Sequence, residues 1–213
     1  MKWSTAIRHL RDLAGAAASP AAKFSLPVTE LWAAGTLVGA PRDDVDHSTV
    51  AVVVDLPVDE VPWLTRPTGA DHWANLTRVA KAPVRVLWRS AHAPVWNHEI
   101  DRPVLFWDRE TGLDDDILRA LSDGRGEDVR LDAPSPEELR ARVQADLEVS
   151  LKALRARTKA YEDRRWAPGK LTAVSDALWE ASNGYVDLLD GSWGCPPPGK
   201  TRGAGAPPGA KEP

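Results

Sequence analysis

The chain has 213 residues, 27 basic and 31 acidic side chains, and a formal net charge of −4 at pH 7. A chain of this length can bury the core of one domain with a helical appendage, and 43% hydrophobic with 27% charged residues is an ordinary globular composition. Nucleic-acid phosphates need a basic face, and the basic residues here are mixed with acidic ones. We therefore expect no nucleic-acid partner.

The cysteine content and the N-terminal segment point to a cytoplasmic protein. Cys195 is the only cysteine, so an intrachain disulfide and a cysteine-ligated zinc are both excluded, as suits a reducing compartment. Small residues near position 20 resemble a signal-peptide cleavage site, but Arg8, His9, Arg11 and Asp12 interrupt the apolar stretch that such a peptide needs. No apolar run is long enough to span a bilayer, so we expect no membrane partner.

The first half of the chain predicts alternating helices and strands. Apolar residues at helical spacing from Trp3 to Ala14 predict a first amphipathic helix that Gly15 ends. Asp71 is the expected N-cap of a helix that continues to Ala80, and a short helix is expected from Asp114 to Leu121. The strands are expected at Val28 to Ala34, Ser48 to Leu56, Val84 to Arg89 and Pro103 to Trp107. The fold class is therefore α/β (α+β), with a mixed sheet of about four strands and flanking helices.

The second half of the chain predicts a helical hairpin. Ser135 and Glu138 form a capping box, and the apolar stripe that begins at Leu139 predicts one long helix to about Arg165. A second stripe follows the break at Pro168-Gly169, so the two helices should pack antiparallel. We expect an α/β domain over 1–130, a helical hairpin packed on it over 131–190, and a Pro/Gly-rich tail over 191–213.

The segment from Val28 to Asp55 carries the main functional signal. A strand runs into the turn GTLVG, an Asp-rich loop follows, and STVAVVVD forms the next strand. This outline resembles a degenerate member of the minimal nucleotidyltransferase-like superfamily. In that superfamily a Gly-Ser turn holds the terminal phosphates of a nucleotide, and carboxylates on one strand face bind two magnesium ions. The resemblance implies a ligand site at Gly35, Thr36, Gly39 and Ser48.

The chain departs from the superfamily pattern at the residues that bind metal. Thr49 and Ala51 occupy the two carboxylate positions, and the later strand VRVLWR carries no acid for the third. Without anionic ligands the metal ions have nothing to bind, and phosphoryl transfer loses its electrostatic stabilisation. The resemblance therefore implies a non-catalytic binding or regulatory protein without a cofactor. Its ligand would be a nucleotide held at Gly35-Thr36 or a protein docked on the helices.

Three alternatives stay open at this point. A shifted register would make Asp44, Asp46 and Asp55 the carboxylates of an active magnesium-dependent nucleotidyltransferase, although acids in a loop are more often a solvated turn. An oxygen/nitrogen metal site is also conceivable, but its spacing matches no established pattern; its members would be His92, His98, Glu99 and Asp101. The third alternative is an enzyme of another class with a tryptophan-walled pocket, since the chain has ten tryptophans.

Overall fold

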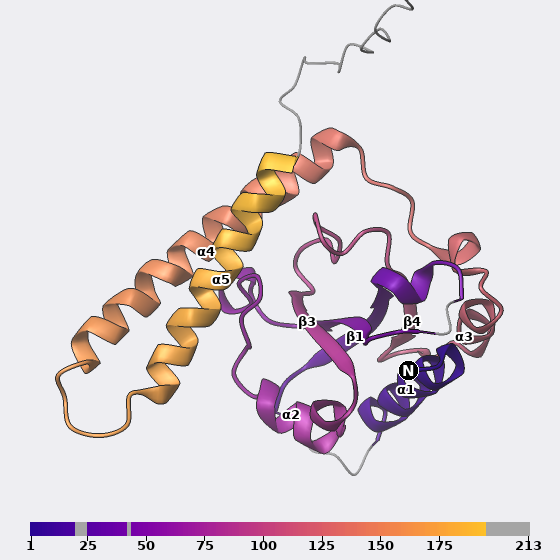
Figure 1. Cartoon of the computed structure of the whole chain (residues 1–213), viewed down its shortest axis with the longest axis horizontal. Coiled ribbons are helices and arrows are strands. Elements are labelled where there is room, and N and C mark those ends of the chain that lie inside the picture. The colour runs from indigo at the N-terminus through magenta and orange to yellow at the C-terminus, as the bar shows by residue number, and fades with distance from the viewer. Residues whose placement is uncertain (20–24, 42–43, 195–213) are drawn as a thin grey trace, which may run out of the picture.

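One mixed sheet organises the computed structural model, which describes residues 1–19, 25–41 and 44–194 (Figure 1). Its strand order is β3-β2-β1-β4-β5. The strands are β1 (Val28–Ala34), β2 (Ser48–Val54), β3 (Val84–Ser90), β4 (Val104–Asp108) and β5 (Gly112–Leu113). The expected fold class is confirmed, and β5 was missed because two residues are too few to show a period.

The strand pairing places the end of β1 next to the beginning of β2. β1 pairs antiparallel with β2 and with β4, whereas β2 and β3 are parallel. A parallel pair needs a crossover, and the chain between these strands supplies it with α2 (Ala70–Leu76) and the short 3-10 helix η3 (Val79–Lys81). Because Ala34 lies opposite Thr49, the turn that follows β1 lies beside Thr49.

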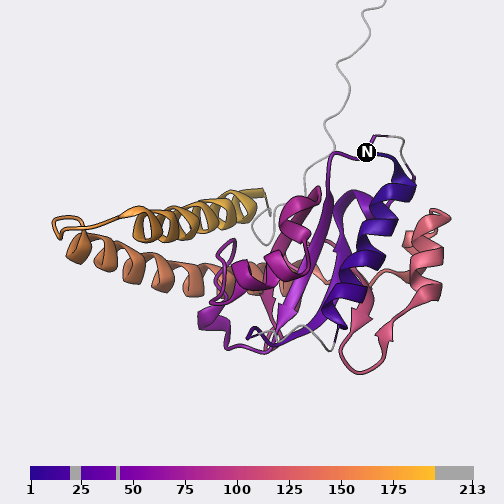
Figure 2. The same ribbon diagram turned by 90° about the horizontal axis from the view of Figure 1, so that it is seen from below.

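Each face of the sheet is covered by a different set of helices. Residues of α1 (Trp3–Ala17), α2 and α3 (Asp115–Ser122) share one core cluster with Val50, Val52 and Val54 of β2. Ala51 and Val53 point the other way, into a cluster with residues of the C-terminal hairpin. Figure 2 shows α1 and the hairpin on opposite sides of the sheet. The prediction that this strand is buried on both faces is confirmed.

The helix expected between Asp71 and Ala80 is interrupted. α2 begins at Ala70 after Gly69, so the prediction that Asp71 is the N-cap is wrong. The Asp71 carboxylate instead accepts a hydrogen bond from Arg66 at 2.8 Å. Arg78 has φ +60°, and this left-handed residue ends the helix and starts η3, which buries Val79. The left-handed turn at Arg78 has thus overridden the local helical period.

The hairpin consists of α4 (Pro136–Arg164) and α5 (Thr172–Gly194). α5 runs beyond the expected boundary at 190. Glycine suits position 191 because any larger residue would clash with His98: an added Cβ would lie 2.2 Å from its Cδ2. The rest of the expected tail, 195–213, lies outside the described residues. Trp166 and Trp179 of the hairpin are exposed, in contrast to Trp63 and Trp73 of the domain core.

Removal of the α4 cap is a first test of this structure. The Ser135 hydroxyl accepts a hydrogen bond from the N–H of Glu138 at 3.2 Å, and the Glu138 carboxylate accepts one from the N–H of Ser135 at 2.7 Å. Ser135→Ala should therefore lower the free energy of unfolding by about 1 kcal/mol, measured by urea denaturation. Ser135→Asp keeps a side-chain acceptor and should retain most of the stability. Equal losses in both variants would contradict the assignment of the cap.

Candidate functional site

A small polar cleft lies where β1 ends and β2 begins. Gly35 has φ +65°, a backbone conformation that favours glycine, and its Cα faces Thr49: a Cβ on Gly35 would lie 3.6 Å from the Thr49 hydroxyl. The cleft has a volume of about 320 Å³. Its lining consists of Gly35, Thr36, Asp44, Val45, Asp46, His47, Thr49, Arg85 and Glu99.

Two of the four expected ligand-binding residues line this cleft. Gly35 and Thr36 do so. Gly39 instead closes the turn, because its N–H donates to the Thr36 carbonyl at 3.3 Å. Ser48 is fully buried and is not among the residues that line the cleft. Successive residues of a strand point to opposite faces, so the hydroxyl that reaches the cleft belongs to the neighbour, Thr49.

The three carboxylates of the shifted register are not brought together. Asp44 and Asp46 line the cleft, whereas Asp55 follows the far end of β2 and contacts His92, with 3.1 Å between the carboxylate oxygen and Nε2. Seven strand residues separate the two groups, and at about 3.3 Å per residue this corresponds to about 20 Å. Within the described part of the chain, no group of three or more His, Cys, Asp or Glu side chains is arranged to hold a metal ion.

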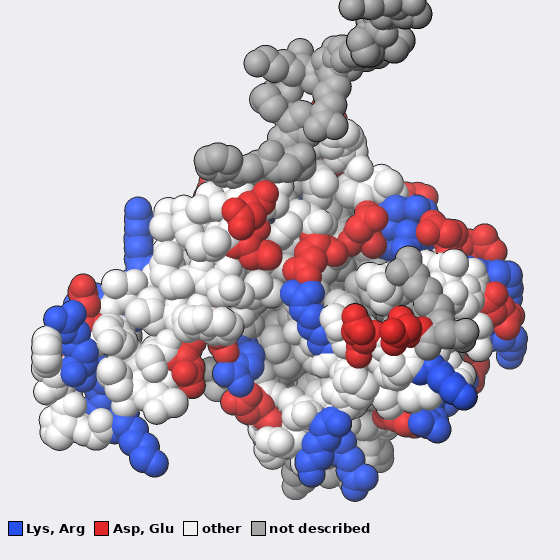
Figure 3. Space-filling view, viewed as in Figure 1, with Lys and Arg blue, Asp and Glu red and all other residues white. Residues whose placement is uncertain are grey.

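The third strand places an arginine beside Thr49. Arg85 pairs with Thr49 in the β2–β3 register and forms an ion pair with Glu99. The cleft thus contains three carboxylates, from Asp44, Asp46 and Glu99, against Arg85, which is already paired, and the N-terminal ammonium group, which lies 3.9 Å from Asp44. Figure 3 shows several acidic and few basic side chains toward the middle of this face of the molecule. The cleft therefore favours cationic groups over phosphates.

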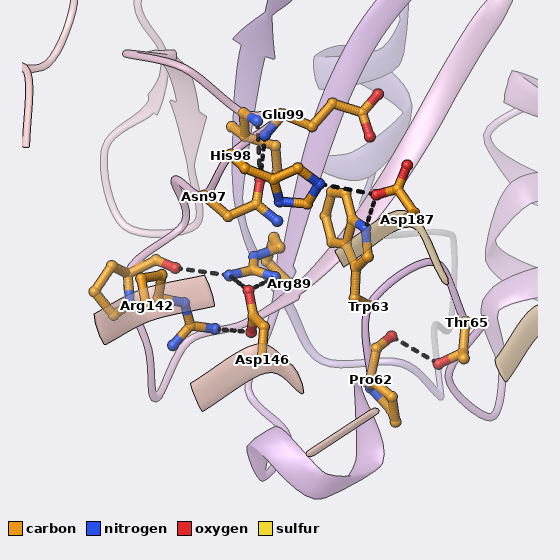
Figure 4. Close-up of polar contacts among 12 residues, drawn as sticks. Pro62, Trp63, Thr65, Arg89, Asn97, His98, Glu99, Arg142, Asp146 and Asp187 are labelled. Carbon is orange, nitrogen blue, oxygen red and sulfur yellow. Dashed lines mark hydrogen bonds and ion pairs between the residues drawn. The ribbon is translucent and has the colours of Figure 1, made fainter. Parts of the chain in front are cut away.

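The loop from Asn97 to Glu99 connects this cleft with the hairpin (Figure 4). Glu99 lines the cleft, and the neighbouring His98 binds Asp187 of α5, with 2.9 Å between Nε2 and the carboxylate oxygen. The same oxygen accepts a hydrogen bond from Trp63 Nε1 at 2.6 Å. Asn97 holds the loop, because its side-chain oxygen accepts hydrogen bonds from the N–H groups of Glu99 and Ile100 at 3.0 and 2.9 Å.

A buried ion pair attaches α4 to the same region of the sheet. Arg89 of β3 donates from Nη1 and Nη2 to Asp146, each at 3.2 Å, and from Nη2 to the Pro94 carbonyl at 3.2 Å. Arg142 binds the other oxygen of the Asp146 carboxylate. Burial lowers the pKa of the Arg89 guanidinium to about 10, and the Asp146 carboxylate opposes this shift, so Arg89 stays charged at neutral pH. Each helix of the hairpin thus inserts one carboxylate, Asp146 or Asp187, into the sheet domain.

Sequence reasoning missed this junction. Asp146 precedes Leu147 in what reads as an ordinary amphipathic helix, and Arg89 ends a strand that was expected for its apolar residues. One sequence signal was available: Asp146 lies three residues after Val143, so its carboxylate falls on the apolar face of the helix. Three of the four residues suggested for an oxygen/nitrogen metal site contact different partners instead: His92 lies against Asp55, His98 lies against Asp187, and Glu99 forms an ion pair with Arg85.

The family match covers the sheet, the cleft and the hairpin. The chain belongs to the family described as "Domain of unknown function (DUF7711)", whose model matches residues 1–193. Neither a search of curated proteins nor a search of solved structures gives a match. None of the helices in the described ranges combines the length and apolar character required to cross a membrane.

Proposed function

We propose that this chain is a non-catalytic, nucleotidyltransferase-like binding or regulatory protein. The observation that supports this proposal is the pairing of the Gly35 turn with Thr49. The turn and strand meet as the resemblance requires, but a hydroxyl stands where a metal-binding carboxylate is needed. On the neighbouring strand the paired position holds Arg85, which would repel a metal ion.

The charge of the cleft favours a protein partner over a free nucleotide. Nucleotide phosphates would meet three carboxylates, and the one arginine already binds Glu99. We therefore propose a cytoplasmic protein partner that places a Lys or Arg side chain beside Asp44 and Asp46, because the long stem and cationic head of such a side chain suit an acidic cleft. The partner is not a nucleic acid, for the same electrostatic reason.

The Asn97–Glu99 loop supplies a route from the cleft to the hairpin. A ligand that withdraws Glu99 from Arg85 would shift the loop that also holds His98 against Asp187. Binding in the cleft would then alter how α5 sits on the sheet domain, which is the regulatory element of the proposal.

Calorimetry with magnesium and a nucleoside triphosphate tests the non-catalytic assignment. We expect no magnesium-dependent binding of ATP or GTP and no nucleotidyl transfer, because no described set of carboxylates can hold the metal. The decisive variant is Asp44→Asn, with Asp55→Asn, at the far end of β2, as its matched control. Tight metal-dependent nucleotide binding with nucleotidyl transfer, both lost in Asp44→Asn, would overturn the non-catalytic assignment, and their persistence in Asp55→Asn would show that Asp55 is not part of the metal site.

A further inference from the structure

A second cleft lies on the opposite side of the sheet from the hairpin, between α1 and the α2–η3 segment. Its volume is about 500 Å³, within the range of small-molecule sites. Leu13 of α1 and Leu76 of α2 face it together with Val79 and with Val84 at the start of β3. Leu76 is 44% exposed, which is unusual for a leucine between two helices. The cleft thus offers an apolar floor that is open to solvent.

A glycine in α1 leaves this cleft open. Gly15 lines the cleft and lies inside the helix, which continues to Ala17. It is not among the glycines with positive φ, and an added Cβ would meet no atom within 4 Å. Glycine weakens a helix relative to alanine, and neither backbone conformation nor close packing requires it here. A side chain at this position would enter open space at the cleft.

Opposite charges face this space without neutralising each other. Asp12 lines the cleft from α1, and Arg78 lines it from the turn between α2 and η3. Within the described residues neither side chain has an ion pair, whereas the neighbouring Arg11 binds Asp115 at 2.6 Å. Arg78 holds its position with φ +60°, a conformation that non-glycine residues rarely adopt and that is often found at functional sites. His9 adds a buried Nδ1 without a partner.

We propose that this cleft binds an α-amino acid with an apolar side chain. The carboxylate of the ligand would bind Arg78, its ammonium group would bind Asp12, and its side chain would lie against Leu13, Leu76 and Val79. A zwitterion with an apolar body matches one unpaired cation, one unpaired anion and an apolar floor. This site is separate from the Gly35–Thr36 cleft and does not depend on the function proposed there.

Calorimetry on the full chain with L-leucine tests the proposal. Two ligand analogues separate the charges: 4-methylpentanoate lacks the ammonium group, and 3-methylbutylamine lacks the carboxylate. We expect leucine to bind and each analogue to bind at least about tenfold more weakly, since each leaves one charged side chain without its partner. No binding of leucine, isoleucine or phenylalanine at millimolar concentration, or equal binding of leucine and either analogue, would overturn the proposal.

Variants at Gly15 locate the site. Gly15→Leu should fill the cleft and abolish leucine binding without lowering the melting temperature, because the added side chain enters open space and leucine favours a helix more than glycine does. Gly15→Ala is the matched control and should retain binding. At the exposed Arg78, Arg78→Gln should weaken binding at least about tenfold and Arg78→Lys much less, which provides a test that does not depend on Gly15. Binding that survives both Gly15→Leu and Arg78→Gln would place the ligand elsewhere.

Discussion

Replacing Asp146 with alanine is expected to lower the free energy of unfolding by about 3–5 kcal/mol. The Asp146 carboxylate binds Arg89 and Arg142, and the side chain of Arg89 is only 3% exposed. Without Asp146, Arg89 would keep a buried positive charge with only the Pro94 carbonyl as an acceptor. Urea denaturation followed by circular dichroism measures the loss.

Two variants serve as controls for this prediction. Glu148→Ala removes an acid from the exposed face of the same helix and should change the stability by no more than about 0.5 kcal/mol. The double variant Arg89→Met/Asp146→Leu removes the most deeply buried pair of charges and should recover part of the loss, because apolar residues can replace a buried ion pair at little cost, while Arg142 still loses its partner. A near-neutral Asp146→Ala would mean that α4 does not dock on Arg89.

Gly184→Ala is expected to destabilise the protein by at least about 2–3 kcal/mol, because overpacking forces the backbone to move. Gly184 is buried in α5, and an added Cβ would lie 2.0 Å from the carbonyl oxygen of Trp63. Since this contact is with backbone, α5 would have to shift, and the hydrogen bond between Trp63 and Asp187 would be strained with it. Guanidinium denaturation followed by circular dichroism gives the stability.

The sign of the stability change in Gly184→Ala shows whether α5 approaches the Trp63 backbone closely. In a helix, Gly→Ala by itself stabilises by about 1 kcal/mol, so a loss can come only from the contact with Trp63. Asn183→Ala, at the exposed neighbouring position, is the matched control and should be neutral or slightly stabilising. If Gly184→Ala proved more stable than the parent chain, the close approach of α5 to Trp63 would be refuted.

Local sequence signals were sufficient for the layout of elements. Ser135 and Glu138 marked the start of α4 because both partners of the cap lie within one turn of the chain. The apolar run of β2 predicted burial on both faces because side chains alternate along a strand. The Gly35 turn was recognised, and the structure shows the positive φ that glycine permits there. Each of these features depends on residues that are close together in the sequence.

The two clefts and the buried ion pair depend on contacts between residues that are distant in the sequence. No local sequence pattern indicates such contacts. Asp44, Asp46 and Asp55 formed one carboxylate set only in the alternative, shifted register, but β2 lies between them and carries Asp55 to the opposite end of the sheet. Arg89 and Asp146 are separated by 57 positions, so neither residue by itself indicated the ion pair. The clefts likewise arise only where α1 meets Arg78 and where β1 meets β2. Periodicity and capping act over a few residues, whereas the electrostatics of a buried site are decided by which charges the folded chain brings together.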